Sequence, residues 1–86
     1  MNKHDIIMYS AKLCGDCQHL KAFMERHGIH FENRDIREEP HHGETLEQKT
    51  GKLGVPYLVI NGEWVRGYDP GKPFSEDFAK ALFGMA

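Results

Sequence analysis

The sequence predicts a small α/β domain with a mixed sheet. A compact apolar run at residues 6–9 is followed by apolar residues at helical spacing from Cys17 onward, and then by a second short apolar segment. A strand, a helix and a strand in this order form a right-handed unit in which the two strands are parallel. Further along, Asn61-Gly62 separates two apolar runs, which is typical of an antiparallel hairpin. The predicted order of elements is therefore β-α-β-α-β-β-α.

The first three elements are defined by their apolar residues. Residues 6–9 fit a central buried strand that ends at the polar stretch 10–12. The first helix is expected from Cys17, and Gly28 follows it as a C-terminal stop. Its face is marked at helical spacing by Leu20, Phe23, Met24 and His27. Residues 29–36 are expected to form the second strand, whose apolar members are Ile29, Phe31 and Ile36.

A short helix and a hairpin come next. Residues 44–50 are expected to form the second helix, with Leu46 as its apolar anchor and Gly51 behind it. The hairpin pairs strand 57–60 with strand 63–66, because Asn-Gly tolerates the positive φ angles of a two-residue turn. In that register Val59 and Trp64 pair on one face. The other face carries Leu58, Ile60 and Val65.

The last helix is expected over residues 74–82. Phe74, Phe78 and Leu82 recur every four residues, and this apolar stripe can pack on the sheet. Trp64 is interpreted as a packing residue of the hairpin. His41 and His42 follow the Glu38-Glu39-Pro40 stretch and are expected in a surface loop.

Length and charge limit the classes of function. The 86 residues are expected to form one domain, 1–86. The formal net charge is −2, which is too near neutral to favour nucleic acid or an anionic membrane as a partner. No apolar stretch approaches the roughly 18 residues of a membrane helix, and the first apolar run is too short for a secretory signal. We therefore expect a soluble, cytoplasmic protein that acts as a monomer.

The motif that carries chemistry is Cys14-Gly15-Asp16-Cys17, where the first strand gives way to the first helix. Unpaired backbone N–H groups and the positive end of the helix dipole favour a thiolate at this point. Cys14 is therefore the candidate nucleophile. Cys17 lies one helical turn further on, close enough to attack a mixed disulfide on Cys14. This division of roles is typical of thiol-disulfide exchange.

Three other interpretations of the two cysteines stay open. A structural zinc site needs four nitrogen or sulfur ligands, and without a second Cys-X-X-Cys the remainder would have to come from His41 and His42. A static disulfide is disfavoured, because so short a loop adds little stability. An inert buried pair is disfavoured by the strand-to-helix location. Redox chemistry is the favoured interpretation.

Three motifs, taken in order, resemble those of glutaredoxin-like members of the thioredoxin-fold family, a group that includes electron donors of ribonucleotide reductase. They are Tyr9-Ser10 leading to the cysteine motif, Gly54-Val55-Pro56 before the hairpin, and Gly67-Tyr68-Asp69 after it. The likeness covers residues 6–82, nearly the whole chain. It implies a four-stranded mixed sheet flanked by three helices, with Cys14 as the attacking thiol and Cys17 as the resolving thiol.

The resemblance also implies a set of substrate-binding residues. Val55-Pro56 matches the family's cis-proline, where the backbone of Val55 is expected to pair with an extended thiol substrate. An ordinary proline at a strand start is the alternative. Gly67-Tyr68-Asp69 resembles the loop that meets glutathione, so its N–H groups are expected to hold the γ-glutamyl carboxylate and Asp69 the amine. An ordinary turn before the last helix is the alternative for Asp69.

The chain departs from the family pattern at several positions. Gly15 and Asp16 stand where glutaredoxins usually have proline and an aromatic residue, and the charge of Asp16 beside the Cys14 thiolate leads us to expect a more reducing site. Lys12 lies two residues before Cys14, whereas the family's basic residue lies three before. Both anion recognition and a solvated position are open for Lys12. Pro70 replaces a common acidic residue of the glutathione loop, which weakens the case for glutathione.

The predicted function is that of a dithiol thiol-disulfide oxidoreductase, which reduces protein disulfides or glutathione mixed disulfides. No bound cofactor is expected, and glutathione is the expected co-substrate. The reductant is glutathione or an enzyme of the thioredoxin-reductase type. The alternative is a metal-binding module. It would hold either zinc or a 2Fe-2S cluster bound by Cys14 and glutathione, for which Gly15 leaves room.

Overall fold

The computed structural model describes residues 5–85. Its elements along the chain are β1 (Ile6–Ser10), α1 (Gly15–Arg26), β2 (Glu32–Asp35), α2 (Pro40–Thr50), β3 (Tyr57–Ile60), β4 (Glu63–Arg66) and α3 (Glu76–Leu82). The predicted order of elements is confirmed. None of the helices in this described part of the chain is long and apolar enough to cross a membrane.

The four strands form one mixed sheet in the order β2-β1-β3-β4. β1 runs parallel to β2, and β3 runs antiparallel to both β1 and β4. In the hairpin Val59 lies opposite Trp64, which is the predicted register. Asn61 and Gly62 take φ angles of 52° and 87°, so the turn uses the left-handed conformation for which the Asn-Gly pair is suited.

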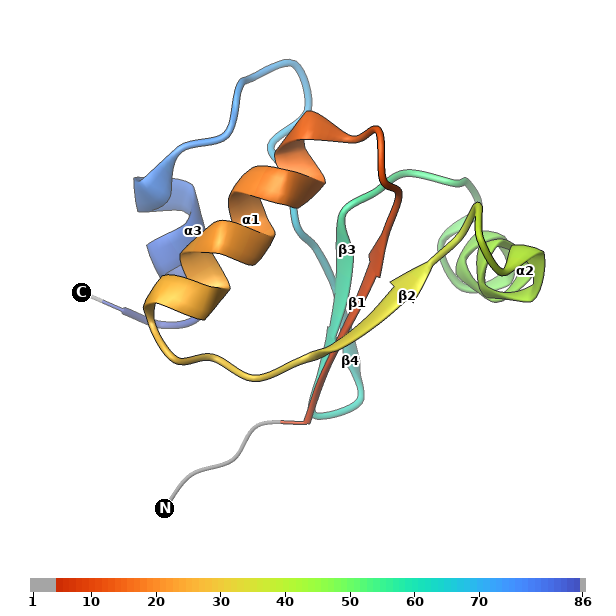
Figure 1. The fold of residues 1–86 in the computed structure, drawn as a ribbon, viewed down its shortest axis with the longest axis horizontal. Helices are drawn as coiled ribbons and strands as arrows, with labels where there is room; N and C mark the ends of the chain where they lie inside the picture. Colours follow the sequence, from red (N-terminus) through yellow and green to blue (C-terminus); the bar gives the residue numbers. More distant parts are fainter. Residues whose placement is uncertain (1–4, 86) are drawn as a thin grey trace.

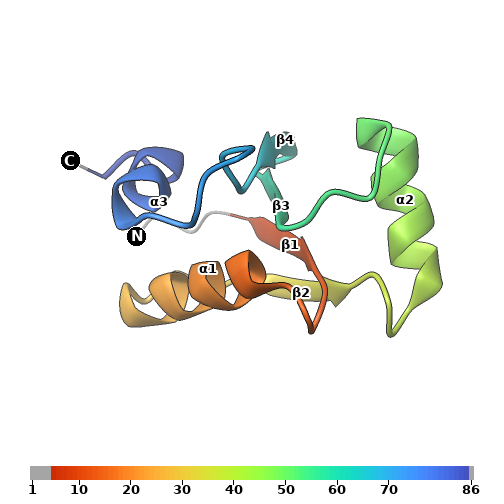
Figure 2. The ribbon, with the colours of Figure 1, turned by 90° about the horizontal axis from the view of Figure 1, so that it is seen from above.

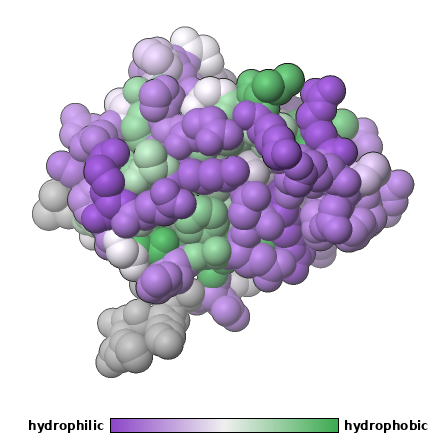
Figure 3. Space-filling model, viewed as in Figure 1, coloured by the Kyte–Doolittle hydropathy of each residue, from purple (hydrophilic) through white to green (hydrophobic). Residues whose placement is uncertain are grey.

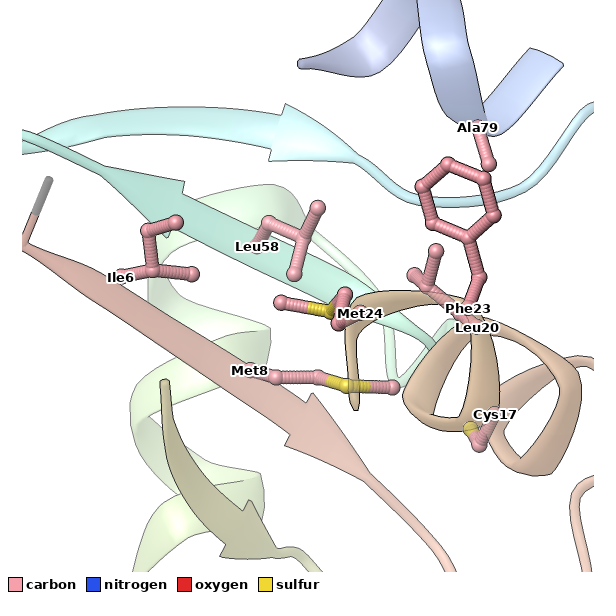
Figure 4. Packing of buried hydrophobic residues seen from close by; sticks show 8 residues of the cluster. All are labelled: Ile6, Met8, Cys17, Leu20, Phe23, Met24, Leu58 and Ala79. Carbon is pink, nitrogen blue, oxygen red and sulfur yellow. The ribbon is translucent and has the colours of Figure 1, made fainter. Parts of the chain in front are cut away.

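The helices lie on both faces of the sheet. α1 and α3 cover one face and α2 the other (Figure 1 and Figure 2). The larger core fills the space between the sheet and the α1–α3 pair (Figure 4). Its fully or almost fully buried members are Ile6, Met8, Cys17, Leu20, Phe23, Met24, Leu58 and Ala79. Each large apolar side chain buried in this way contributes about 1.5–3 kcal/mol to folding.

A smaller core lies between the sheet and α2. Tyr9, Leu46 and Val59 are its buried members. The Tyr9 ring stacks on Trp64 with a centroid distance of 5.3 Å, so Trp64 is a packing residue as predicted. Because β1 carries Met8 toward one core and Tyr9 toward the other, both faces of this central strand are buried.

The second strand is shorter than predicted. Pairing with β1 begins at Glu32, opposite Ile7, and ends at Asp35, opposite Ser10. The prediction of a strand over residues 29–36 is therefore wrong at its ends. Ile29 and Phe31 still pack against the larger core, but they do so from the connection that brings the chain from α1 to β2.

α1 begins at Gly15 with Cys14 as its N-cap, so the expected place of the cysteine motif at the start of the first helix is confirmed. The starts of the other two helices differ from the prediction. α2 begins at Pro40 rather than residue 44, with the proline in the first turn, where its missing N–H is not needed. α3 begins at Glu76 rather than residue 74. The Ser75 hydroxyl caps it by accepting the N–H of Phe78 at 3.1 Å.

The two neighbouring histidines lie in the first turn of α2, not in a loop. His41 is exposed, but the His42 side chain is only 15% exposed, so its predicted surface position is wrong. Its ring meets Tyr9 edge-on at 6.2 Å and its Nε2 lies 2.9 Å from the Glu39 carboxylate. Extending α2 by one turn is what turns His42 toward the sheet.

Candidate active site at the start of α1

Cys14 occupies the N-cap of α1. Its backbone is extended, with φ −95° and ψ 112°, and its Sγ accepts the N–H of Cys17 at 3.1 Å. The sulfur thus takes the place that a serine or aspartate oxygen takes at most helix starts. This position offers a sulfur anion both a backbone donor and the positive end of the helix dipole. Cys14 is half-buried, so part of it is open to solvent.

Cys17 lies one turn further on and faces inward. It is fully buried among the residues of the larger core (Figure 4). Burial raises the pKa of the Cys17 thiol to about 12, and its interaction with the Cys14 side chain acts in the same direction. Neither cysteine is in a disulfide. The arrangement therefore joins one accessible thiol to one shielded thiol that keeps its proton at neutral pH.

The segment before β3 comes up beside Cys14. The Val55–Pro56 peptide bond is cis, as the resemblance implies. The Cys14 thiol lies 3.8 Å from the Val55 carbonyl oxygen, which it faces as a donor. Within residues 5–85 the Val55 N–H takes part in no backbone hydrogen bond, so it is available to an extended ligand.

Gly67 fixes the end of β4 against the same segment. Its N–H donates to the Pro56 carbonyl oxygen at 3.0 Å. A Cβ at position 67 would lie 3.0 Å from that oxygen and 3.2 Å from Leu20, so glycine permits this close approach. The Gly67 N–H is thus already used within the protein, which differs from the expectation that it meets a ligand.

A groove of about 470 Å³ lies beside the motif, and we call it the basic groove. Five residues singled out from the sequence line it, namely Asp16, Gly54, Tyr68, Asp69 and Pro70. Three cations that the sequence analysis did not single out line it as well: Lys52, Arg66 and Lys72. Arg66 lies 5.7 Å from the centre of the Tyr68 ring and donates from Nε to the Tyr68 carbonyl at 3.1 Å. Each of these three cations lies within three residues of the Gly54-Val55-Pro56 or the Gly67-Tyr68-Asp69 motif. This closeness along the chain is the signal by which the sequence could have identified them.

Lys12 does not line the basic groove. Its ammonium pairs with the Glu38 carboxylate in the connection between β2 and α2, and this hydrogen bond raises the pKa of Lys12. Both side chains are well exposed, so the pair contributes little to stability. The Lys12 backbone carbonyl accepts a hydrogen bond from the side-chain amide of Gln18 at 3.1 Å, which links the turn between β1 and α1 to the helix.

In the described part of the chain, the two cysteines have no third ligand close enough to form a metal site. Within residues 5–85, the clustered histidine, cysteine and carboxylate ligands are Glu39, His41 and His42, whose ligand atoms lie within 4.8 Å of one another. These residues belong to the start of α2 and leave Cys14 and Cys17 outside the cluster. A tetrahedral zinc site needs four ligands, so the geometry does not favour the zinc interpretation of the cysteines.

Comparisons with known proteins agree with the geometry. A family model described as Glutaredoxin matches residues 6–65. The structure resembles the glutaredoxin of Archaeoglobus fulgidus with a TM-score of 0.69 and 26% identity, covering 92% of this chain and 85% of that one. A glutaredoxin of Brucella melitensis gives a TM-score of 0.65 and 25% identity, covering 93% and 78%. No curated protein sequence matches the chain.

A buckwheat glutaredoxin solved as a complex with glutathione gives a TM-score of 0.65 at 23% identity, covering 73% of this chain and 60% of that one. At this identity the likeness concerns the fold alone. Together these neighbours confirm the thioredoxin fold, a four-stranded mixed sheet with three helices.

Proposed function

Since this chain belongs to the glutaredoxin family, and is therefore a thiol-disulfide oxidoreductase, we propose that Cys14-Gly15-Asp16-Cys17 carries its activity. One observation supports this most directly. The Cys14 sulfur caps α1 and accepts the Cys17 N–H at 3.1 Å, while the Cys17 side chain is fully buried. A half-accessible sulfur held by a helix start is suited to attack, and a shielded neighbour one turn away is suited to resolve.

The reaction proceeds in two exchanges. The Cys14 thiolate attacks one sulfur of the substrate disulfide, a new S–S bond forms, and the other substrate sulfur leaves as a thiolate. Cys17 then gives up its proton and attacks the Cys14 sulfur, which releases the second substrate thiol. The substrate gains two electrons from the cysteine pair; Cys17 supplies one proton, and solvent supplies the other to the thiolate that leaves in the first exchange. The raised pKa of Cys17 keeps its proton in place until the second exchange.

The substrates we propose are glutathione mixed disulfides and protein disulfides. Glutathione carries two carboxylates and one ammonium group. The basic groove offers Arg66 and Lys52 for the carboxylates and Asp69 for the ammonium, in line with the role proposed for the Gly67-Tyr68-Asp69 loop. The backbone of Val55 is proposed to pair with the extended part of the substrate, beside Pro56. Gly67 is proposed to position this segment through its hydrogen bond to Pro56.

Gly15 and Asp16 are proposed to set the redox character of the site. Asp16 is the acidic residue of the first turn of α1 and lines the basic groove. Its charge supports the helix but opposes a second negative charge on the Cys14 sulfur. Lys12 remains a candidate for anion recognition, for which it would have to leave Glu38.

The setting we propose is a reducing cytoplasm, where the protein acts as a monomer with glutathione or a thioredoxin-reductase-type enzyme as its reductant. The basic groove favours glutathione as the direct co-substrate, because its cations outnumber its carboxylates. The metal-binding alternative has no comparable support. The described residues offer the cysteines no third ligand, and a glutathione-held 2Fe-2S cluster rests on the family resemblance alone.

The decisive experiment is to trap the intermediate. Cys17→Ser incubated with oxidised glutathione is expected to gain one glutathione on Cys14, seen as an intact-mass adduct mapped by peptide mass spectrometry. Cys14→Ser is the matched control and is expected to gain none at Cys17, which is buried. A clean failure of Cys17→Ser to form the adduct would reject the assignment.

The reductant is identified by a second assay. The oxidised protein is mixed either with glutathione and glutathione reductase or with thioredoxin reductase, and consumption of the nicotinamide cofactor is followed. We expect turnover with glutathione. Turnover with thioredoxin reductase alone would assign the protein to the other class of electron donor.

A further inference from the structure

The surface near Cys14 carries two exposed leucines. Among residues 5–85 the exposed large hydrophobic side chains are Leu13, at 91%, and Leu53, at 52%. Leu13 directly precedes Cys14, and Leu53 lies two residues before Val55. Figure 3 shows strongly hydrophobic atoms at the top of the molecule, over the turn between β1 and α1, beside a largely hydrophilic surface. A single exposed leucine is ordinary, but both of these adjoin the segments that form the site.

Leu53 lines a second groove, which has a volume of about 520 Å³ and which we call the α2 groove. Its apolar wall is formed by residues from four segments: Ala11, Ile36, Pro40, Leu53 and Val55. The extended segment before β3 divides the two grooves. Leu53 and Val55 line the α2 groove, whereas Gly54 between them lines the basic groove. Val55 is also the residue whose carbonyl oxygen lies 3.8 Å from the Cys14 sulfur, so one lining residue of the α2 groove is in contact with the nucleophile.

The two grooves differ in charge. The basic groove has the cations Lys52, Arg66 and Lys72 against two carboxylates. The α2 groove has Glu44 and Glu47 against one guanidinium, that of Arg37. Both of these glutamates are exposed, and within residues 5–85 neither forms an ion pair. An anionic tripeptide such as glutathione therefore suits the basic groove, and an apolar segment with a positive charge suits the α2 groove.

We propose that the α2 groove, together with Leu13, is the docking surface for protein disulfide substrates. The occupant is an extended segment of a partner protein, with an apolar side chain beside its reacting cysteine and a lysine or arginine close by. Its backbone pairs with Val55, its apolar side chain packs against Leu53 and Leu13, and its positive charge faces Glu44 and Glu47. This inference rests on the proposed function and adds to it a surface that selects protein substrates separately from glutathione.

The chemistry at this surface is the same two-step exchange. The partner's disulfide is attacked by Cys14 and becomes a mixed disulfide. Cys17 then releases the second partner thiol, so that the partner is reduced and the cysteine pair is oxidised. The α2 groove orients the partner's disulfide, while the electrons come from Cys14 and Cys17. Its effect is therefore expected in KM and kcat/KM for protein-like substrates, not in the reactivity of Cys14 itself.

The experiment compares two substrates in each variant. One is a disulfide-bridged peptide with leucine and lysine beside its cysteine, and the other is the mixed disulfide of glutathione and 2-mercaptoethanol. Leu13→Ser/Leu53→Ser is expected to lower kcat/KM for the peptide about tenfold, the factor that corresponds to losing the burial of roughly one leucine side chain. The glutathione reaction is expected to change less than about twofold. Thermal unfolding checks that the variant is folded.

Charge reversal gives the second arm. Glu44→Lys/Glu47→Lys is expected to lower kcat/KM for the lysine peptide and to raise it for the same peptide with glutamate in place of lysine. Arg66→Glu, in the basic groove, is the matched control and is expected to impair the glutathione reaction while sparing the peptide. If either double variant leaves the ratio of the peptide and glutathione reactions unchanged, the proposed surface is overturned.

Failure of this inference is distinguishable from failure of the proposed function. Cys14→Ser must abolish both reactions if the cysteine motif carries the activity. When it does so and the ratio in the groove variants stays constant, only the docking surface is rejected. When Cys14→Ser retains activity, the proposed function fails and the docking surface fails with it.

Discussion

Tyr68 lies across Gly54, so that a Cβ at position 54 would stand 2.5 Å from the phenol oxygen and 3.3 Å from the ring carbon that bears it. This contact joins the loop after β4 to the segment before β3, two parts of the chain that both line the basic groove. Arg66 in turn covers the Tyr68 ring at 5.7 Å. The position of this ring is therefore set by the absence of a side chain at residue 54.

We expect Gly54→Ala to displace Tyr68 and to disturb the basic groove. The close atom is the far end of a side chain, so the loss of stability is expected to be about 1 kcal/mol, the low end for overpacking. KM for a glutathione mixed disulfide should rise, with kcat largely kept. Gly54→Ala/Tyr68→Phe removes the closest atom and is expected to recover part of the KM. Equal KM values for wild type and Gly54→Ala would contradict the contact's role.

Asp16→Ala is expected to make Cys14 more reactive. Removing the carboxylate of the first helical turn relieves its repulsion of a negatively charged sulfur. We expect the rate of Cys14 alkylation by iodoacetamide at pH 7 to rise about two- to fivefold at low ionic strength, and the gain to shrink in salt. If wild type and Asp16→Ala are alkylated at the same rate at every ionic strength, Asp16 does not modulate the reactivity of Cys14.

The buried Cys17 thiol predicts a loss of stability at alkaline pH. Its pKa is raised from an ordinary value of 9.0 to about 12 in the folded protein. The unfolded chain therefore releases this proton first as pH rises, so the contribution is fully present below pH 9 and is lost progressively above it. The slope is at most about 1.4 kcal/mol per pH unit. Urea unfolding of the reduced protein between pH 7 and pH 10.5 should show this slope in wild type but not in Cys17→Ala. Parallel curves would contradict it.

Asp35 is expected to stabilise the end of β2 and to lose this effect in acid. Its carboxylate accepts the N–H groups of Arg37 and Glu38 at 2.8 and 2.9 Å, and the bond from Glu38 is the main cause of its lowered pKa. Because the folded pKa lies below the ordinary 3.8, the contribution is present above that pH and is lost as pH falls through the lowered value. Asp35→Ala should lose about 1–2 kcal/mol at pH 7 in urea unfolding and less at pH 3. Glu25→Ala, on the exposed face of α1, is the control for general effects of acid. An equal loss at both pH values would disprove the linkage.

Gly67→Ala is expected to destabilise the protein by about 1–3 kcal/mol, because its methyl group would press on the Pro56 carbonyl and Leu20. Gly15→Ala is the matched stability control, since a Cβ there meets nothing within 4 Å. Alanine in the first turn of α1 should be neutral or slightly stabilising. The measurement is the thermal unfolding midpoint of each variant, which we expect to be lower for Gly67→Ala. Equal midpoints would show that the end of β4 shifts to accommodate the added methyl group without loss of stability.

Strand pairing decided where β2 begins and ends, which differs from the predicted range. The apolar residues Ile29 and Phe31 suggest a strand from residue 29, yet the ladder with β1 starts only at Glu32. The early start of α2 did have a local signal, because Pro40 follows an extended N-cap residue, and proline is favoured in the first turn. His42 was misplaced as a consequence of that missed turn.

The sequence by itself determined the order of the elements, the register of the hairpin and the place of the cysteine motif at the start of a helix. These features depend on periodicity, turn residues and spacing within a few neighbours, which the chain carries locally. Tertiary structure alone decided that Lys12 pairs with Glu38 and that Leu53 and Gly54 line different grooves. These relationships depend on segments that are distant along the chain, because the β1–β3 pairing brings the segment before β3 beside the start of α1. Contacts between such distant segments cannot be predicted from the spacing of neighbouring residues.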